Sequence, residues 1–431
     1  MIRNIILATL IICSQFLPTV NLSLAQAPNE KATYVGAGKC KQCHKDIYKG
    51  WKSTMHPYKF QQAAPANIVG DFSRNNSFEA DGETTIMFEK NKEYFITTTG
   101  PDNKEHTYKI GYVIGGFWKQ LYVTEFSNGE LHILPAMWIV ESQSWKERKN
   151  WSKAIYQYSC SGCHNTGTQI NFDKSSETFK TTWSDMGVAC EACHGPGSNH
   201  LNAEEDDKSG TIVNPAKIPD PRRAAMVCGS CHTRGSSGEG KYGYPSGYKP
   251  GGQLNFMFSE KPKLHPDDSS RANRQEYIDW KKSGHAREGI VCWDCHYTHR
   301  KGNSNKYQTK LPGSSLCRSC HEVENKGVHG IHSVNSCVGC HMSPIGKRAA
   351  KGDVHSHQFK VISPKETIDA GGYEKQPNSC NACHYHKNDK PEDMLNVLKK
   401  VKTFGKTGRC LIDRPNLNKA DSADAKKRAA D

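Results

Sequence analysis

The stretch Cys190-Glu191-Ala192-Cys193-His194 places two cysteines three positions apart and a histidine directly after the second. The pattern occurs eight times in 431 residues and uses sixteen of the 18 cysteines. Its members are Cys40/Cys43/His44, Cys160/Cys163/His164, Cys190/Cys193/His194, Cys228/Cys231/His232, Cys292/Cys295/His296, Cys317/Cys320/His321, Cys337/Cys340/His341 and Cys380/Cys383/His384. Because histidine makes up only 20 of the 431 residues, its presence after all eight pairs is not chance.

This repeat is the signature of covalently attached haem c. The two thiols form thioethers with the vinyl groups of the porphyrin, and the adjacent imidazole then reaches the iron from one face. Cysteine pairs at this spacing also occur in zinc ribbons and disulfide frameworks, but neither needs a histidine after every pair. We therefore expect eight covalently bound haems c, each with its motif histidine as the first axial ligand of iron.

The composition fits a chain that folds around a cofactor. Only 35% of the residues are hydrophobic and the mean hydropathy is −0.74, which is low for a chain with a core made of its own side chains alone. Haem supplies apolar mass, and without it we expect no stable fold. The formal charge of +14 is offset by the haem propionates, so the sequence argues against nucleic acid as a partner.

The N-terminus has the pattern of a secretory signal peptide over residues 1–27. Arg3 precedes an apolar run over residues 5–12, and Ala25-Gln26-Ala27 provides a cleavage sequence, with cleavage after Ala25 as a competitor. No later stretch reaches the roughly 20 apolar residues of a transmembrane helix. We expect export to the periplasm or the cell exterior, without a transmembrane anchor.

The spacing of the motifs divides the remaining chain. We expect a first haem segment over 28–76, a haem-free β-rich insert over 77–150, a seven-haem region over 151–390, and a C-terminal helix with a flexible tail over 391–431. The expected fold class is mainly α, with much irregular structure wrapped around eight haems and a small antiparallel β insert.

Residues of the insert alternate in the manner of β-strands at 84–88 and 94–99. The runs 118–124 and 130–134 flank Asn128-Gly129, which is a strong hairpin signal. The insert is either a lid over a haem edge, which we favour, or a docking surface for a partner or a neighbouring copy. Helical pieces are expected within 185–200, 271–295 and 391–402.

The second axial ligand of each iron decides between electron transfer and chemistry. A second histidine closes the iron, whereas an open position lets a small molecule bind it. Twelve histidines lie outside the motifs. The candidates for distal ligands are His56, His200, His285, His299, one of His329 and His332, and His357 with His355 in reserve; His106 and His132 are expected to be structural, and His265 and His386 are undecided.

The motifs and their surroundings resemble the cytochrome c-554/c-prime family and its octahaem relatives. Cys40 to His44 followed by Trp51-Lys-Ser-Thr-Met-His56 is similar to the opening site of that family, and Cys160 to His164 with Gly187 to His200 is similar to its second and third sites. The resemblance implies electron transfer along a packed haem array. It also implies that the haem at the second site can lack a distal ligand, which would leave an open iron on His164.

Three functions remain open on the sequence. The first is an exported octahaem cytochrome that carries electrons between redox partner proteins. The second is an oxidoreductase that acts on a nitrogen or sulfur compound, such as hydroxylamine, nitrite or tetrathionate, at one open haem on His164. The third is a subunit of a haem filament or another homo-oligomer. No cysteine pair is followed by lysine, so the usual marker of a lysine-ligated catalytic haem is absent, and Cys410 is the one cysteine after the signal that no motif uses.

Overall fold

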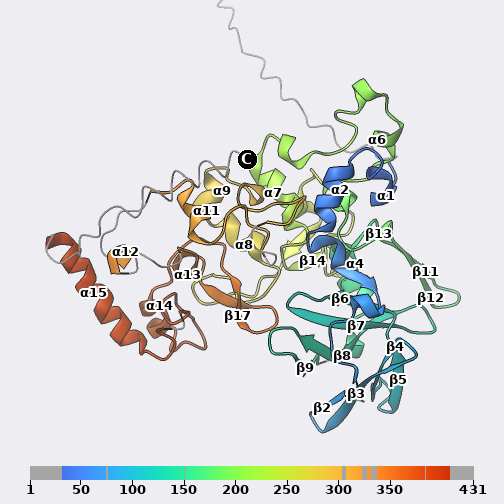
Figure 1. The fold of residues 1–431 in the computed structure, drawn as a ribbon, viewed down its shortest axis with the longest axis horizontal. Coiled ribbons are helices and arrows are strands. Elements are labelled where there is room, and N and C mark those ends of the chain that lie inside the picture. Colours follow the sequence, from blue (N-terminus) through green and yellow to red (C-terminus); the bar gives the residue numbers. More distant parts are fainter. Residues whose placement is uncertain are drawn as a thin grey trace, which may run out of the picture.

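The computed structural model describes residues 32–73, 76–149, 151–302, 307–322, 328–331, 337–383 and 385–407. The predicted signal peptide, His332, His384, Cys410 and the predicted flexible tail beyond residue 407 lie outside the described residues. Two sheets lie at one end of the molecule and the long helix α15 at the other, with the motif-bearing segments between them (Figure 1).

Two antiparallel sheets form the region between the first motif and the second. The larger sheet has the order β1-β6-β7-β8-β9 and the smaller is the meander β2-β3-β4-β5. The strands are β1 Phe60–Gln62, β2 Asn76–Ala80, β3 Glu83–Lys90, β4 Glu93–Thr99, β5 Glu105–Lys109, β6 Tyr112–Gly115, β7 Lys119–Glu125, β8 Leu131–Ile139 and β9 Ser144–Glu147. The predicted hairpin is confirmed, because β7 pairs with β8 across a turn in which Gly129 has a φ of 78°.

The two sheets share one apolar core. Met87 of β3 and Ile96 of β4 are fully buried against Tyr122 of β7 and Leu134 of β8. Side chains on alternate positions of a strand point to the same face, and burial alternates along β4 in that manner. This region is therefore held by its own side chains.

Around the motifs the chain forms short helices and small ribbons. The helices are α1 Ala37–Cys40, α2 Lys45–Lys52, α3 Tyr156–Ser159, α4 Ser161–His164, α5 Cys190–His194, α6 Ser198–Asn202, α7 Pro221–Gly229, α8 Glu276–Lys281, α9 Gly284–Arg287, α10 Cys292–Cys295, α11 Ser314–Arg318, α12 Val328–Ile331, α13 Cys337–His341 and α14 Pro364–Asp369. The ribbons pair β10 Asn165–Thr166 with β13 Asp185–Met186, β11 Gln169–Asp173 with β12 Thr178–Thr182, β14 Gly235–Ser237 with β15 Phe258–Glu260, and β16 Pro344–Lys347 with β17 Lys351–His355.

The expectation of a mainly α fold is wrong. Helix accounts for 29% of the chain and strand for 25%. The β insert is a pair of sheets rather than one small antiparallel sheet, and many of the helices near the motifs last only four or five residues. Such short helices suffice because a haem motif needs one helical turn, whereas longer helices pack by burying an extended apolar stripe of their own.

Local sequence explains where the longer helices begin. Asp220 caps α7 by accepting a hydrogen bond from the Arg222 amide, with Pro221 at the first helical position. The helix predicted over 391–402 corresponds to α15, which spans Pro391–Thr407. Within the described part of the chain, none of the helices combines the length and the apolar character needed to cross a bilayer.

Candidate functional site

We number the eight motifs sites 1 to 8 in chain order. At several of them the backbone closes one helical turn, and the amide of the motif histidine donates to the carbonyl of the first cysteine. This bond is 2.9 Å for His44, His232 and His321, and 3.0 Å for His296. Residues three apart on a helical turn share a face, so both thiols point to the same side and the histidine follows directly. The turn is thus arranged to hold one macrocycle at three points.

Five motif histidines face a second imidazole at a spacing that fits one iron. A metal–imidazole nitrogen bond is about 2.0–2.1 Å and the ring centre lies about 1 Å behind the nitrogen, so rings on opposite sides of one ion have centres roughly 6 Å apart. The pairs are His44 with His200 at 6.2 Å, His194 with His299 at 5.9 Å, His296 with His357 at 6.4 Å, His321 with His285 at 5.9 Å, and His341 with His329 at 6.2 Å.

These pairs fit haem better than the other uses of cysteine and histidine. Among the described residues, no three Cys, His, Asp or Glu side chains converge as a zinc site requires, and the described cysteines are free thiols. A porphyrin supplies four equatorial donors, so a pair of facing imidazoles is all that the chain has to add at each iron. The residues present therefore fit covalently bound haem c.

The motif thiols differ in how far the chain encloses them. Cys163 of site 2 is buried, whereas Cys43 of site 1 and Cys320 of site 6 are exposed to solvent. Cys383 of site 8 is only partly buried, and the next residue, His384, lies outside the described residues. A thioether is covalent and does not depend on burial, so these exposures leave haem attachment at Cys43, Cys320 and Cys383 as a prediction. At site 2, Cys160 packs against the larger sheet and the Cys163 thiol lies against the Ser230 carbonyl.

Hydrogen bonds to the other ring nitrogen hold several of the facing imidazoles in place. Nδ1 of His194 lies 2.7 Å from the Val213 carbonyl, Nδ1 of His296 lies 2.8 Å from the Tyr307 carbonyl, and Nδ1 of His357 lies 3.0 Å from the His355 carbonyl. A carbonyl can only accept, so Nδ1 carries the hydrogen and Nε2 is left to bind metal.

The remaining predicted ligands have other positions. His56 is close enough to His232 and His299 for their charges to help lower its pKa to about 3, with burial as the main cause. Neutral imidazole is the form that binds metal. Nδ1 of His355 lies 2.6 Å from the Met342 carbonyl oxygen, at hydrogen-bond distance. His332 falls outside the described residues.

Histidines that were expected to be structural or were left undecided contact protein groups. His106 and His132 lie in the sheets and contact Asp102 and Glu130, respectively. Nδ1 of His265 lies 3.2 Å from the Lys375 carbonyl, and Nδ1 of His386 lies 2.9 Å from Asp389. Nothing in these contacts places any of the four opposite a motif histidine.

Contacts between motif segments place the first five sites side by side. Helix α1 of site 1 packs on α5 of site 3, where Ala37, Ala189 and Cys190 share a small apolar cluster. Another cluster joins Cys193 of site 3 to α7 of site 4 and to Trp293 of site 5. Site 2 reaches site 4 through Cys163, whose Sγ lies 3.8 Å from the Ser230 carbonyl.

The later sites continue the same row. The Cys295 carbonyl of site 5 accepts from the Lys310 amide in the segment that leads to site 6. The Cys337 amide of site 7 donates to Ser314 Oγ of α11 at 2.9 Å, and Ser379 Oγ, next to Cys380 of site 8, donates to the Cys340 carbonyl at 2.9 Å. The motifs therefore follow the order 1-3-4-5-6-7-8, with site 2 branching at site 4.

Site 2 differs from the sites with paired imidazoles. No histidine among the described residues stacks against His164, and its buried Nδ1 has no hydrogen-bond partner there. Burial is the main cause that lowers the pKa of His164 to about 3, and the charges of Lys59, Arg274 and Lys119 contribute to that shift. The imidazole of site 2 thus lies in the field of three cations rather than opposite another imidazole.

The three cations come from distant parts of the chain. Lys59 directly precedes β1, Lys119 begins β7, and Arg274 precedes α8. Burial, with repulsion from Arg348, lowers the pKa of Lys59 to about 8. Arg274 has a φ of 64°, a backbone conformation that costs energy for a non-glycine residue, and its buried Nε has no partner among the described residues. Its position is fixed although one of its donors is unused.

The larger sheet positions this cluster. Strand β8 is buried along nearly its whole length, because one face packs on the smaller sheet and the other on site 2. On the second face, Phe60 stacks on Tyr156, with ring centres 4.8 Å apart, and Cys160 packs beside them. The Tyr156 hydroxyl donates to Asn165 Oδ1 at 2.5 Å, next to His164. The sheet therefore forms a rigid wall for site 2.

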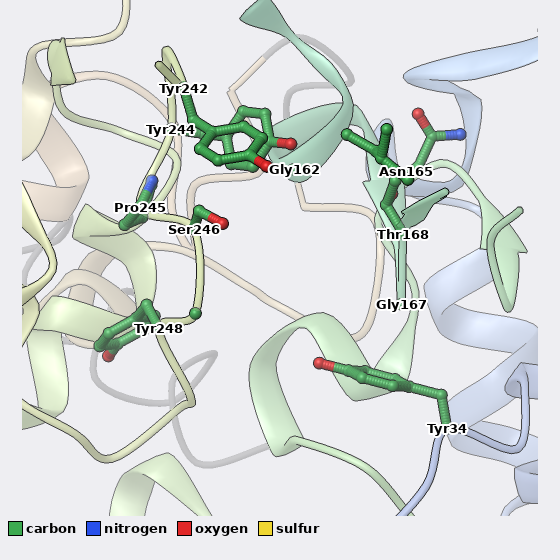
Figure 2. Close-up of a pocket in the computed structure, with 12 residues that line it drawn as sticks. Tyr34, Gly162, Asn165, Gly167, Thr168, Tyr242, Tyr244, Pro245, Ser246 and Tyr248 are labelled. Carbon is green, nitrogen blue, oxygen red and sulfur yellow. The ribbon is translucent and has the colours of Figure 1, made fainter. Parts of the chain in front are cut away.

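A small cavity of about 240 Å³ borders the site 2 turn. Figure 2 shows Tyr34 extending toward the loop that carries Tyr242, Tyr244 and Tyr248. That loop packs closely on the turn, since a Cβ on Gly162 would lie 2.1 Å from the Tyr244 ring. The volume is below the 300–1,000 Å³ typical of pockets for drug-sized ligands, so the cavity fits water or a small ion.

Sequence reasoning missed Lys59, Lys119 and Arg274. Lys59 follows the predicted ligand His56 by three residues, which is a weak signal. Lys119 and Arg274 carry no local signal, because only the pairing of the sheets and the packing of the segment before α8 bring them near His164.

The family described as cytochrome c554 and c-prime matches residues 39–92 and 135–195. These residues contain sites 1, 2 and 3. The match confirms the resemblance that the motifs indicated.

Two of the curated relatives are named as reductases. The chain is 24% identical to the cytochrome c nitrite reductase subunit NrfA of Nitratidesulfovibrio vulgaris over 33% of this chain and 34% of that protein. It is 20% identical to the dissimilatory sulfite reductase MccA of Wolinella succinogenes over 87% of this chain and 61% of that protein. The chain thus spans about a third of the first relative and less than two thirds of the second.

A solved structure has the same fold. The crystal structure of the outer cell wall cytochrome OcwA aligns with a TM-score of 0.62 and 22% identity, over 85% of this chain and 86% of that one.

Proposed function

We propose that this chain, a multihaem c-type cytochrome related to the cytochrome c554 and c-prime family, carries electrons along eight haems c to site 2, where a small oxyanion of nitrogen or sulfur is reduced. The observation that carries the proposal is the setting of His164, which is buried in the electrostatic field of Lys59, Lys119 and Arg274 and stacks on no second imidazole among the described residues.

The two kinds of site suit two tasks. Facing imidazoles would close the iron, so the five paired sites are relays that accept and pass on single electrons. When haem is bound at site 2, it supplies an iron with an open position and the electrons for reduction. The continuous order of motifs from site 8 or site 1 to site 4 would bring electrons next to site 2 from redox partner proteins.

The cations of site 2 define the class of substrate. Three positive charges attract and orient an anion, and a partly buried site strengthens that attraction relative to water. Reduction of an oxyanion consumes protons as well as electrons. Lys59, with a pKa of about 8, can hold a proton on Nζ and release it near neutral pH. Nitrite and sulfite, which the names of two relatives contain, belong to this class.

A simpler function is also supported. The row of neighbouring motifs would serve an exported electron carrier that delivers to a partner and uses site 2 only as a further relay. Export to the periplasm or cell exterior is part of both proposals, in line with the outer cell wall location named for OcwA. Stacking of copies into a filament has no specific observation in its favour.

Ligand binding tests the proposal. The intact mass of the purified protein should correspond to eight haems, and its ferric spectrum should contain a high-spin component of one haem that nitrite, sulfite or cyanide converts. The reduced protein should be reoxidised by nitrite or sulfite, and Lys59→Gln should slow this reaction more than tenfold while Lys365→Gln, which changes an exposed ion pair on α14, should not. A spectrum that these anions leave unchanged would reject reduction at site 2 and leave the electron carrier.

A further inference from the structure

A carboxylate contacts the motif histidine of site 4. Nδ1 of His232 lies 3.2 Å from Oε2 of Glu276, which begins α8, and the Tyr277 amide donates to the His232 carbonyl at 3.1 Å. The Glu276 carboxylate also pairs with the Arg348 guanidinium, and a neighbouring cation favours the ionised carboxylate.

Arg348 links Glu276 to the surroundings of site 2. Its Nη2 lies 3.2 Å from Oε1 of Glu276, and its guanidinium lies 4.2 Å from the ring centre of Trp118. The Arg348 carbonyl accepts from Nζ of Lys119 at 2.7 Å. The Glu276 side chain is only 16% exposed, so water screens this network weakly.

The hydrogen bonding of motif histidines differs between sites. His194 and His296 donate to neutral backbone carbonyls, His232 to a carboxylate, and the buried Nδ1 of His164 has no partner among the described residues. A stronger acceptor on Nδ1 makes the imidazole a more electron-rich ligand, which stabilises ferric iron and lowers the reduction potential. Site 4 has the strongest acceptor on Nδ1 in this comparison and site 2 has none. The two sites are neighbours, because Cys163 Sγ of site 2 lies 3.8 Å from the carbonyl of Ser230, within the motif of site 4.

We propose that Glu276 is a positioning residue that fixes His232 and lowers the reduction potential of the iron at site 4, so that electrons at the branch point pass on to site 2. The effect on site 4 requires only haem bound there. The direction of electron flow into site 2 rests on the proposed function of site 2.

Potentiometric titration of the full holoprotein, with individual haems followed by their low-spin resonance signals, tests the role of Glu276. Glu276→Gln keeps an acceptor for Nδ1 but removes the charge, so one haem should shift to higher potential. Arg348→Gln removes the cation that balances Glu276, so the same haem should shift to lower potential. Glu260→Gln, the same replacement in an exposed ion pair with Lys281, should leave every haem unchanged.

Opposite shifts distinguish electronic tuning from structural damage. Loss of packing would move both variants in the same direction, and that result, or no shift in either, would overturn the proposal. Glu276→Asp keeps the charge and should stay closer to the wild type than Glu276→Gln. Nitrite binding to the high-spin haem should be retained in Glu276→Gln, so failure of anion binding in the wild type would reject the function of site 2 and leave the tuning of site 4 intact.

Discussion

Sites 2 and 3 have the same motif and opposite surroundings. At site 3, His194 is held by the Val213 carbonyl and faces His299, with ring centres 5.9 Å apart. At site 2, Nδ1 of His164 has no partner among the described residues, and the charges nearby are cations. The comparison teaches that the motif determines only one side of the iron. The other side comes from segments far away in the chain and, on the proposed function, decides whether a site relays electrons or binds a substrate.

The largest effect is expected from a variant that leaves the iron of site 3 without its second axial ligand. Replacing His299 with glycine removes the imidazole that faces His194, so the ferric high-spin signal should grow by one haem, as measured by electron paramagnetic resonance and absorption spectroscopy. His106→Gly is the control, because His106 contacts Asp102 in the smaller sheet. An unchanged spectrum in His299→Gly would show that the stacked imidazoles are not axial partners.

A smaller effect is expected at the cationic side of site 2. Arg274→Gln removes one of three charges around His164, and the nitrite dissociation constant should rise at least about tenfold, which corresponds to about 1.4 kcal/mol. Arg271→Gln, an exposed arginine three residues away, should bind nitrite like the wild type. Equal nitrite affinities in the two variants would show that Arg274 does not contribute to anion binding.

The pH dependence of site 2 should follow Lys59. Burial lowers the pKa of this amine from its usual 10.5 to about 8, so Lys59 is a cation below about pH 8 and neutral above it. Nitrite affinity should therefore be highest below pH 8 and fall as the pH rises through that value. In Lys59→Arg the charge persists at high pH, and the decline near pH 8 should disappear. A decline that persists in this variant would assign it to another group.

The smallest effect is expected from a variant that weakens the packing beside site 2 without changing its anion binding. Tyr156→Phe leaves the buried Oδ1 of Asn165 without its donor, which should cost about 1–3 kcal/mol of unfolding free energy in denaturant titration of the holoprotein. The nitrite-sensitive spectrum should remain. Tyr58→Phe removes an exposed hydrogen bond to the Lys52 carbonyl and should change stability little. Loss of the nitrite response in Tyr156→Phe would give Tyr156 a role beyond the scaffold.

Some of the fold could be predicted from local patterns. Asn128-Gly129 between two β-rich runs indicates the hairpin of β7 and β8, because a turn with positive φ is encoded by a few adjacent residues. The predicted fold class is wrong because it gives the short helices near the motifs too much weight and expects one small sheet where the insert forms two. How the strands of the insert associate depends on contacts such as Met87 with Tyr122, which no local pattern contains.

The motif cysteines show what local pattern leaves out. Every motif has the same spacing, yet Cys163 is buried while Cys43 and Cys320 are exposed and Cys383 is partly buried. Burial depends on which segments pack over a turn, and the motif contains no information about them. The sequence could therefore predict attachment at each cysteine but not the surroundings of the bond.

The candidate distal histidines likewise could be identified from the sequence but not assigned to a site. His200 follows the motif of site 3 in sequence but stacks on His44 of site 1, and His299 follows site 5 but stacks on His194 of site 3. Sequence spacing could identify them as candidates but not assign them to a motif. The assignment depends on the crossing of segments in space.

By itself the sequence determined the class of cofactor, because attachment depends on residues within one helical turn; from its eight motifs it predicts eight thioether-bound haems, each with the motif histidine as first axial ligand. Tertiary structure alone decided which imidazoles face each other, that site 2 branches at site 4, and that Lys59, Lys119 and Arg274 surround His164. The physical reason is the separation along the chain of the residues that each feature requires. Covalent attachment is local, whereas the field and the sixth ligand at an iron come from whatever the folded chain brings to its other face.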